Sequence, residues 1–274
     1  MTEPQPSPSL VGTMYDQLTD IFAQNFGGNL HFGYWENEKD NSSVEVATDR
    51  LTDLVAGRLA LSGVGRVLDV GCGSGKASVQ IATGRGLHVV GITVSDYQLQ
   101  LSRVRSYDKG LPGRVSFHLA DAAELPFGDS SFDGAYAIES IIHIRDKDAV
   151  FGHLARVLRP GARLVVADMY LNGEISGEEA DLVAQARQLF QAPPFITAEI
   201  YRKYVHRAGL QLLEFTDIRE NVQRSYASLV TMCHQIASIS GGEASSQMAT
   251  IAHIIEQFGV IPQVSYMLLT AIRP

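Results

Sequence analysis

Residues 67–75, VLDVGCGSG, form an apolar strand that runs into a glycine-rich turn, and a helical pattern begins at Lys76. Glycine allows positive φ angles and lets a ligand approach the main chain closely. In an open parallel sheet, such a turn lies at the carboxyl edge of a strand, where ligands bind. The stretch therefore predicts a binding site for a nucleotide-like ligand, and a tight turn without a ligand is the less favoured interpretation.

The segments that follow alternate between short β-branched runs and helical patterns. Strands are expected at residues 66–70, 87–92, 114–119, 132–138 and 163–167. Helices are expected between them at residues 76–83, 97–108 and 146–158. The sequence LRPG at 158–161 predicts a helix end followed by a turn. This alternation is typical of a parallel, doubly wound α/β sheet with right-handed crossovers.

The two flanks of this region have different patterns. Residues 1–10 are expected to be a loose tail, helices are expected at 11–26 and 44–61, and an aromatic segment, HFGYW, occupies 31–35. Later helical patterns cover 174–191, 198–208, 226–240 and 245–258, and strands are expected at 211–217 and 264–272. We therefore expect an N-terminal tail with lid helices over 1–60 and an α/β core over 61–170. A helical cap over 171–274 would be interleaved with the last two of seven strands.

Composition and charge exclude several classes of function. The chain has 274 residues, of which 45% are hydrophobic and 19% charged, so it can bury a core. Its net charge of −8 disfavours nucleic acid and anionic membranes as partners. No apolar run approaches the roughly 20 residues of a membrane helix, and the N-terminus has no signal-peptide pattern. A cytoplasmic protein with a small-molecule partner is expected.

Cysteine and histidine spacing gives no support for a metal site. Cys72 and Cys233 are the only cysteines and do not form a CxxC pair, and no HxH or HExxH spacing occurs. The glycines at 71, 73 and 75 follow GxGxG and not the dinucleotide pattern GxGxxG, and the second strand ends in GITVS without an acid. An NAD site and a Walker phosphate site are therefore both disfavoured.

Several motifs, taken in order, resemble the class I S-adenosylmethionine (SAM)-dependent methyltransferases, which have a Rossmann-like fold. They are VLDVGCGSGK (67–76), VGITVSDYQ (90–98), LADAAELPFGDSSFDGAYAIESIIHIRD (119–146), RVLRPGARLVVADM (156–169) and HFGYW (31–35). The resemblance runs from about Tyr15 to Asp168 and is to the small-molecule tailoring branch. Within that branch, the sequence is similar to rebeccamycin-type sugar O-methyltransferases and to the methyltransferase-like proteins of spinosyn polyketide assembly.

The resemblance implies a set of cofactor-binding residues. The backbone of Gly71, Cys72 and Gly73 would face the methionine half of SAM, and Asp69 would stiffen the loop or reach the amino group through water. Further positions are implied by the same motifs: Thr93 and Gln98 for the ribose, Asp121 and the Ala122 backbone for the adenine, and Tyr34 and Trp35 over the methionine end. Ser95 is expected to cap the following helix. Two alternative interpretations stay open: Trp35 could serve only in the packing of the lid, and Asp121 could be only a turn residue.

His143 is the candidate base, because it follows the fourth strand at the carboxyl edge of the sheet. Asp168 ends the neighbouring fifth strand and would orient or polarise the imidazole. Activity would then rise with pH near ~6.5 or above. The related sugar O-methyltransferases carry two adjacent histidines here, whereas this chain has Ile142-His143. A capping or core histidine is the alternative interpretation.

The resulting hypothesis is a SAM-dependent methyltransferase that acts on a hydroxyl of a bulky, glycosylated or macrocyclic secondary metabolite. Apolar cap residues would line a large pocket: Phe190, Phe195, Ile196, Tyr201, Tyr226, Met232, Ile236 and Phe258. Thr197 either caps a helix or donates to a substrate carbonyl. The alternatives are a SAM-binding cyclase that closes a polyketide ring without methyl transfer, and a non-enzymatic SAM-binding regulator.

Overall fold

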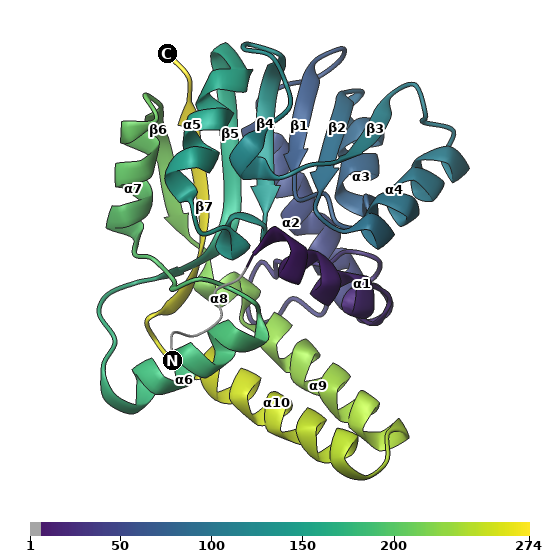
Figure 1. Cartoon of the computed structure of the whole chain (residues 1–274), viewed down its shortest axis with the longest axis vertical. Helices are drawn as coiled ribbons and strands as arrows, with labels where there is room; N and C mark the ends of the chain where they lie inside the picture. Colours follow the sequence, from purple (N-terminus) through teal and green to yellow (C-terminus); the bar gives the residue numbers. More distant parts are fainter. Residues whose placement is uncertain (1–6) are drawn as a thin grey trace.

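A seven-stranded sheet with the order β3-β2-β1-β4-β5-β7-β6 runs through the middle of the computed structural model, which describes residues 7–274 (Figure 1). The strands are β1 (Arg66–Val70), β2 (His88–Thr93), β3 (Val115–Leu119), β4 (Phe132–Ile138), β5 (Leu158–Leu171), β6 (Gln211–Asp217) and β7 (Val264–Ile272). β1 to β5 are parallel, and β7 pairs antiparallel with both β5 and β6. The predicted doubly wound, mostly parallel seven-stranded sheet is confirmed.

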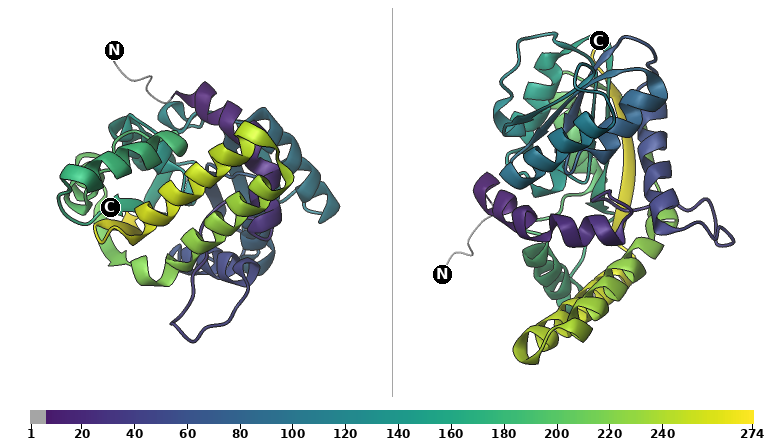
Figure 2. Two further views of the ribbon diagram at one scale, coloured as in Figure 1. Left: turned by 90° about the horizontal axis from the view of Figure 1, so that it is seen from below. Right: turned by 90° about the vertical axis from the view of Figure 1, so that its right-hand side faces the viewer.

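Helices cover both faces of this sheet. They are α1 (Pro8–Asn25), α2 (Val44–Arg58), α3 (Lys76–Arg85), α4 (Asp96–Asp108), α5 (Lys147–Val157), α6 (Gly177–Leu189), α7 (Ala198–Arg207), α8 (Arg219–Val222), α9 (Arg224–Ile239) and α10 (Gly242–Val260). Short 3-10 turns follow β3 and β4, namely η1 (Ala122–Glu124) and η2 (Ile141–His143). The α9–α10 pair extends away from the sheet (Figure 2). Within residues 7–274, no helix has the length and apolar character required to cross a bilayer.

Two apolar clusters, one on each face of the sheet, form the core. Along β1, Val67 belongs to one cluster and Leu68 to the other, because successive side chains point to opposite faces. Burial on both faces explains why the inner parallel strands β1, β2 and β4 are mostly apolar. The first cluster also contains Val183 of α6 and Leu229 of α9, so the cap shares its core with the sheet.

The structure corrects two expected boundaries. Helix α1 begins at Pro8, because Ser7 caps it and proline suits a first helical position, so the tail predicted over 1–10 is too long. Residues 1–6 of that tail lie outside the described residues. The turn predicted at 158–161 is part of β5: Phe132 pairs with Leu158 and Gly134 with Arg163, so a bulge absorbs the extra residues.

Candidate functional site

A cavity of about 380 Å³ lies at the carboxyl edge of β1, β2 and β4 and is bordered by the N-terminal part of α1. Its volume falls within the range of roughly 300–1,000 Å³ that is usual for small-molecule sites. β1 lies between β2 and β4, where the strand order reverses, and such switch points bind ligands in α/β sheets. Nine of the expected site residues line it: Asp69, Gly71, Cys72, Gly73, Thr93, Gln98, Asp121, Ala122 and His143.

The glycine-rich loop presents its backbone to the cavity. Gly71 and Gly73 have φ angles of +77° and +52°, which residues other than glycine rarely adopt. A Cβ atom on Gly71 would overlap the side chain of Ser140, and one on Gly73 would lie 3.0 Å from Cδ1 of Leu30. The loop is therefore shaped for a ligand that approaches the main chain closely.

Asp69 lies beneath this loop and is fixed by two hydroxyl donors. The Ser78 and Tyr136 hydroxyls donate to Oδ2 of Asp69 at 2.5 and 2.7 Å. Burial raises the pKa of Asp69 to about 6, although both hydrogen bonds act in the opposite direction. These contacts join β1 to α3 and β4, and they favour the loop-stiffening role of Asp69 over the water-mediated one.

Thr93 and Gln98 occupy the next corner of the cavity, between β2 and α4. The Thr93 hydroxyl donates to Gln98 Oε1 at 2.8 Å, and Gln98 Nε2 donates to the Thr19 hydroxyl of α1 at 3.2 Å. Ser95 accepts from the Gln98 amide at 3.0 Å, so it is the expected helix cap. The corner is thus fixed from both α4 and α1.

Asp121 and Ala122 border the cavity after β3. Oδ1 of Asp121 accepts from the Ala123 amide at 2.8 Å and caps η1. Asp121 therefore has the turn role that the sequence left open, and it also lines the cavity.

Tyr34 and Trp35 do not line the cavity, contrary to the expectation that they cover one end of the ligand. Trp35 is buried, and its indole N–H donates to the Ser42 carbonyl at 3.0 Å. Its backbone N–H donates to the Asn221 carbonyl at 2.9 Å, and that of Tyr34 donates to Ala47 at 2.8 Å. The aromatic segment passes the site and packs into the protein, and only its beginning, at His31, contributes to the cavity wall together with Leu30.

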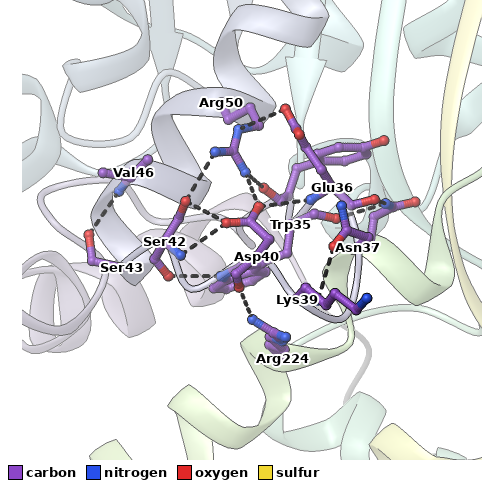
Figure 3. A network of polar contacts seen from close by, with 12 residues as sticks. Trp35, Glu36, Asn37, Lys39, Asp40, Ser42, Ser43, Val46, Arg50 and Arg224 are labelled. Carbon is purple, nitrogen blue, oxygen red and sulfur yellow. Dashed lines mark hydrogen bonds and ion pairs between the residues drawn. The ribbon is translucent and has the colours of Figure 1, made fainter.

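Figure 3 shows the polar network that follows this segment. Asp40 forms an ion pair with Arg50 of α2 and accepts hydrogen bonds from the Ser42 backbone and hydroxyl. The Ser42 hydroxyl and backbone N–H groups hold the pKa of Asp40 well below its usual range, with Arg50 adding to this. Arg224 of α9 donates to the carbonyls of Glu38 and Asp40. The loop is thereby attached to both α2 and α9.

His143 stands in the cavity wall on η2. Its Nε2 forms a hydrogen bond of 2.9 Å with the hydroxyl of Tyr15 on α1, and the two rings meet edge to face. Nδ1 is inaccessible to solvent and no partner meets hydrogen-bond geometry there, although the backbone of Gln191 and Phe190 is close enough to favour the charged ring. Desolvation outweighs this and lowers the pKa of His143 to about 4, so the imidazole is neutral at pH 7.

Asp168, which was expected to orient or polarise the imidazole, forms no direct hydrogen bond to it. Its carboxylate instead accepts from the backbone N–H groups of Ile142 at 2.8 Å and Met169 at 2.9 Å. The strand ends are adjacent, as expected, but the side chain points at the backbone of η2. Asp168 thus holds the turn that carries His143, while burial raises its own pKa.

Glu139 is a cavity residue that sequence reasoning missed. Its Oε1 accepts from the Phe32 amide at 2.6 Å and from the Tyr266 hydroxyl at 2.9 Å. Its φ angle is +49°, and burial raises its pKa to about 8. An acid directly after the apolar strand FDGAYAI was the available signal.

The large apolar pocket expected in the cap is not part of this cavity. None of the eight apolar cap residues lines the cavity. The Phe258 ring lies 5.7–5.9 Å from the rings of Phe190, Phe195 and Tyr226, and Tyr201 packs against Phe151 on the other face of the sheet. Thr197 caps α7 through the Ile200 amide. Among residues 7–274, no group of three or more histidine, cysteine or acidic side chains is arranged to hold a metal.

Comparisons with known proteins agree with this geometry. A methyltransferase-domain family matches residues 62–209. The O-methyltransferase rstn1 of Aspergillus nomiae is 44% identical over 79% of this chain and 95% of its own. The 27-O-demethylrifamycin SV methyltransferase of Amycolatopsis mediterranei is 34% identical over 98% of this chain and 99% of its own.

A solved structure extends the comparison to the whole fold. The [4+2]-cyclase SpnF is 31% identical, its structure covers 99% of this chain and 98% of its own, and the TM-score is 0.84. The matched domain, the relatives and the glycine-rich cavity at the switch point agree on the cofactor and on the type of enzyme. This chain therefore belongs to the methyltransferase-domain family and is a SAM-dependent methyltransferase that acts on a small molecule.

Proposed function

We propose that this protein transfers the methyl group of SAM to a hydroxyl of a bulky, largely apolar secondary metabolite of the polyketide type. The observation that carries the proposal is the position of the His143 imidazole in the wall of the cavity that holds the glycine-rich loop, where desolvation lowers its pKa and favours the neutral ring. The rifamycin-modifying relative supports a macrocyclic acceptor, because it aligns over nearly its whole length. The reaction would take place in the cytoplasm.

The residues of the cavity suit SAM as the ligand. The backbone of Gly71 to Gly73 would hold the methionine half, Thr93 and Gln98 the ribose, and Asp121 with the Ala122 backbone the adenine. Bound SAM supplies an electrophilic methyl group on a cationic sulfur. The carboxyl of Glu139 lies in the same wall, where a cation would favour its ionised form.

The chain's contribution to the chemistry is alignment and proton removal. Well-oriented reactants can have effective molarities of ~10⁵–10⁸ M, and a positioned base adds ~10²–10⁴-fold. His143 would take the hydroxyl proton, and a weakly basic imidazole suffices because the oxygen becomes strongly acidic as its bond to the methyl group forms. Asp168 fixes the backbone of η2 and therefore the place of His143.

A macrocyclic acceptor requires a conformational change. The cavity of about 380 Å³ is close to the lower end of the usual range for ligand sites, and the cap aromatics are in mutual contact. Such an acceptor would enter after α1 or the cap moves, and the apolar cap side chains would then become its pocket.

Ring closure without methyl transfer is the second candidate function, and the likeness to SpnF favours it. Incubation of 27-O-demethylrifamycin SV and other hydroxylated polyketides with methyl-labelled SAM separates the two. Label in the product supports O-methylation. A product that forms at the same rate without SAM, with no label incorporated, would instead establish a cyclase.

Replacing Gln98 with alanine should weaken SAM binding by about 1–2 kcal/mol, which is roughly 5–30-fold, because one or two hydrogen bonds at the ribose corner are lost. Isothermal titration calorimetry with SAM measures this. Thr19→Val is the matched control, because it removes the bond between Gln98 and α1, together with the hydroxyl's own bond to the Tyr15 carbonyl, and leaves the Gln98 side chain in place. A smaller loss in Thr19→Val indicates direct ribose recognition, whereas an unchanged affinity in Gln98→Ala would place the ribose elsewhere.

The fall of kcat/KM at acid pH should be centred well below the usual pKa range of histidine. Because the pKa of His143 falls from 6.5 to about 4, the neutral base dominates above that value, and activity is lost only as pH falls towards it. Initial rates from about pH 5 to pH 8 at constant ionic strength should show no inflection from His143. An inflection near 6.5 that disappears in His143→Ala would contradict a desolvated base.

A further inference from the structure

In this structure, neither nitrogen of the His143 imidazole is accessible to the hydroxyl of a substrate that would accept the methyl group. Nε2 is hydrogen-bonded to the Tyr15 hydroxyl at 2.9 Å. Nδ1 is inaccessible to solvent and lies on the side of the ring away from that bond. A hydroxyl that enters the cavity therefore reaches the base only through the phenol of Tyr15, which itself lines the cavity.

Tyr15 is held in this place by contacts between α1 and the corner of the cavity formed by Thr93, Ser95 and Gln98. Asp16, the next residue, accepts from the Ser95 hydroxyl and from the Tyr97 amide of α4. Thr19, one turn later, accepts from Gln98, and the α1 backbone at Gly12 lies so close to the Val94 carbonyl that a Cβ would be 2.6 Å from it. The contacts that join α1 to this corner of the cavity therefore also fix the position of Tyr15.

We propose that Tyr15 is a catalytic proton relay between the acceptor hydroxyl and His143. This inference rests on the proposed O-methyl transfer. The acceptor hydroxyl donates its hydrogen bond to Oη of Tyr15, and Tyr15 donates its own to Nε2 of His143. The imidazole is then the tautomer with its proton on Nδ1, facing the backbone of Phe190 and Gln191, which favours a protonated ring.

The step balances in atoms and charge. The acceptor oxygen forms a bond to the methyl carbon, the carbon–sulfur bond breaks, and its electron pair stays on sulfur, which becomes the neutral thioether of the product. The acceptor proton passes to Oη of Tyr15 while the phenolic proton passes to Nε2. The positive charge thus moves from sulfur to the imidazolium, and the phenol is never ionised, in keeping with the pKa of Tyr15 being raised by burial.

The direction of the Tyr15–His143 hydrogen bond can be tested on the full-length protein without an acceptor. Nitrogen-15 NMR of histidine-labelled protein, free and saturated with S-adenosylhomocysteine, reports which ring nitrogen carries the proton. The relay requires an unprotonated Nε2 whose resonance shifts in Tyr15→Phe. A protonated Nε2 that donates to Tyr15 would overturn the proposal.

Kinetics provide the second arm. Tyr15→Phe should lower kcat about 10–100-fold, within the range of a lost proton-transfer partner, while SAM affinity stays nearly unchanged. The double variant with His143→Ala should be no slower than His143→Ala alone, because both residues serve one proton path. Tyr97→Phe is the matched control: it removes a hydroxyl bond between α4 and Asp20 of α1 but leaves His143 untouched, so it should keep the wild-type kcat.

The outcomes distinguish the relay from the function on which it rests. A Tyr15→Phe variant with wild-type or higher kcat overturns the relay alone if His143→Ala is still slow, and Tyr15 would then only occupy the place of the acceptor. A wild-type rate in His143→Ala overturns the base assignment and the relay together. The solvent isotope effect on the wild-type rate should indicate two protons that move in the transition state. An isotope effect of only one proton in Tyr15→Phe supports the relay.

Discussion

Replacement of Gly73 with valine is expected to abolish SAM binding. The backbone there has a φ angle of +52°, which strains any β-branched residue, and a Cβ would already lie 3.0 Å from Cδ1 of Leu30. The two methyl groups of valine would extend further into the part of the cavity proposed for the methionine half of SAM. Calorimetry should detect no SAM binding at concentrations that saturate the wild type.

Gly84→Val is the matched control, because Gly84 is a helical glycine of α3 with open space around its Cβ position. It should bind SAM like the wild type. Thermal unfolding of both variants separates loss of the site from loss of the fold. If a folded Gly73→Val variant bound SAM within a few-fold of the wild-type affinity, the loop would not be where the ligand meets the backbone.

Removal of the imidazole in His143→Ala should lower kcat by ~10²–10⁴-fold with SAM affinity nearly unchanged, because the ring serves the acceptor and not the cofactor. Single-turnover rates with labelled SAM measure the chemical step directly. His88→Ala is the control, since His88 is exposed at the start of β2, at the edge of the sheet opposite to the site.

A mild effect of His143→Ala would favour ring closure over methyl transfer. In that case the rate would come from holding a flexible chain in its reactive conformation, and substitutions at Phe258 or Tyr226 that reshape the cap would be the damaging ones. The comparison of the two variant classes therefore distinguishes the two functions even before the natural acceptor is identified.

Local sequence was sufficient for the sheet and for much of the cavity wall at the ends of β1, β2 and β3. β1, β4, β6 and β7 have the predicted bounds, because a charged residue or a glycine lies at or directly after the end of each. The glycine-rich loop, Thr93, Gln98 and Asp121 lie together because parallel strands bring their carboxyl ends to one edge. These are consequences of backbone topology, which the motifs specify.

Side-chain directions could not be predicted in the same way. The adjacency of β4 and β5 was correct, but only the structure shows that Asp168 bonds the Ile142 amide and not the imidazole. Trp35 is buried with its indole N–H on the nearby Ser42 carbonyl and its backbone N–H on the carbonyl of Asn221, which is distant in sequence. Tyr15 counted only as one apolar position of a helical pattern, since nothing in its neighbours indicates that it meets His143.

The attachment of residues 31–43 to the cap has a consequence for how the two substrates affect each other's binding. Asn221 of α8 and Arg224 of α9 donate hydrogen bonds to the backbone of this segment. Near its beginning, the backbone N–H of Phe32 donates to the carboxylate of Glu139 in the cavity wall. A cap that lifts to admit a macrocycle would pull on Phe32 and disturb the cavity wall that is proposed to hold SAM. The affinities for the two substrates are then linked, and such linkage is reciprocal. Each substrate would accordingly weaken the binding of the other by the same factor, which titrations of one substrate in the presence and absence of the other would measure.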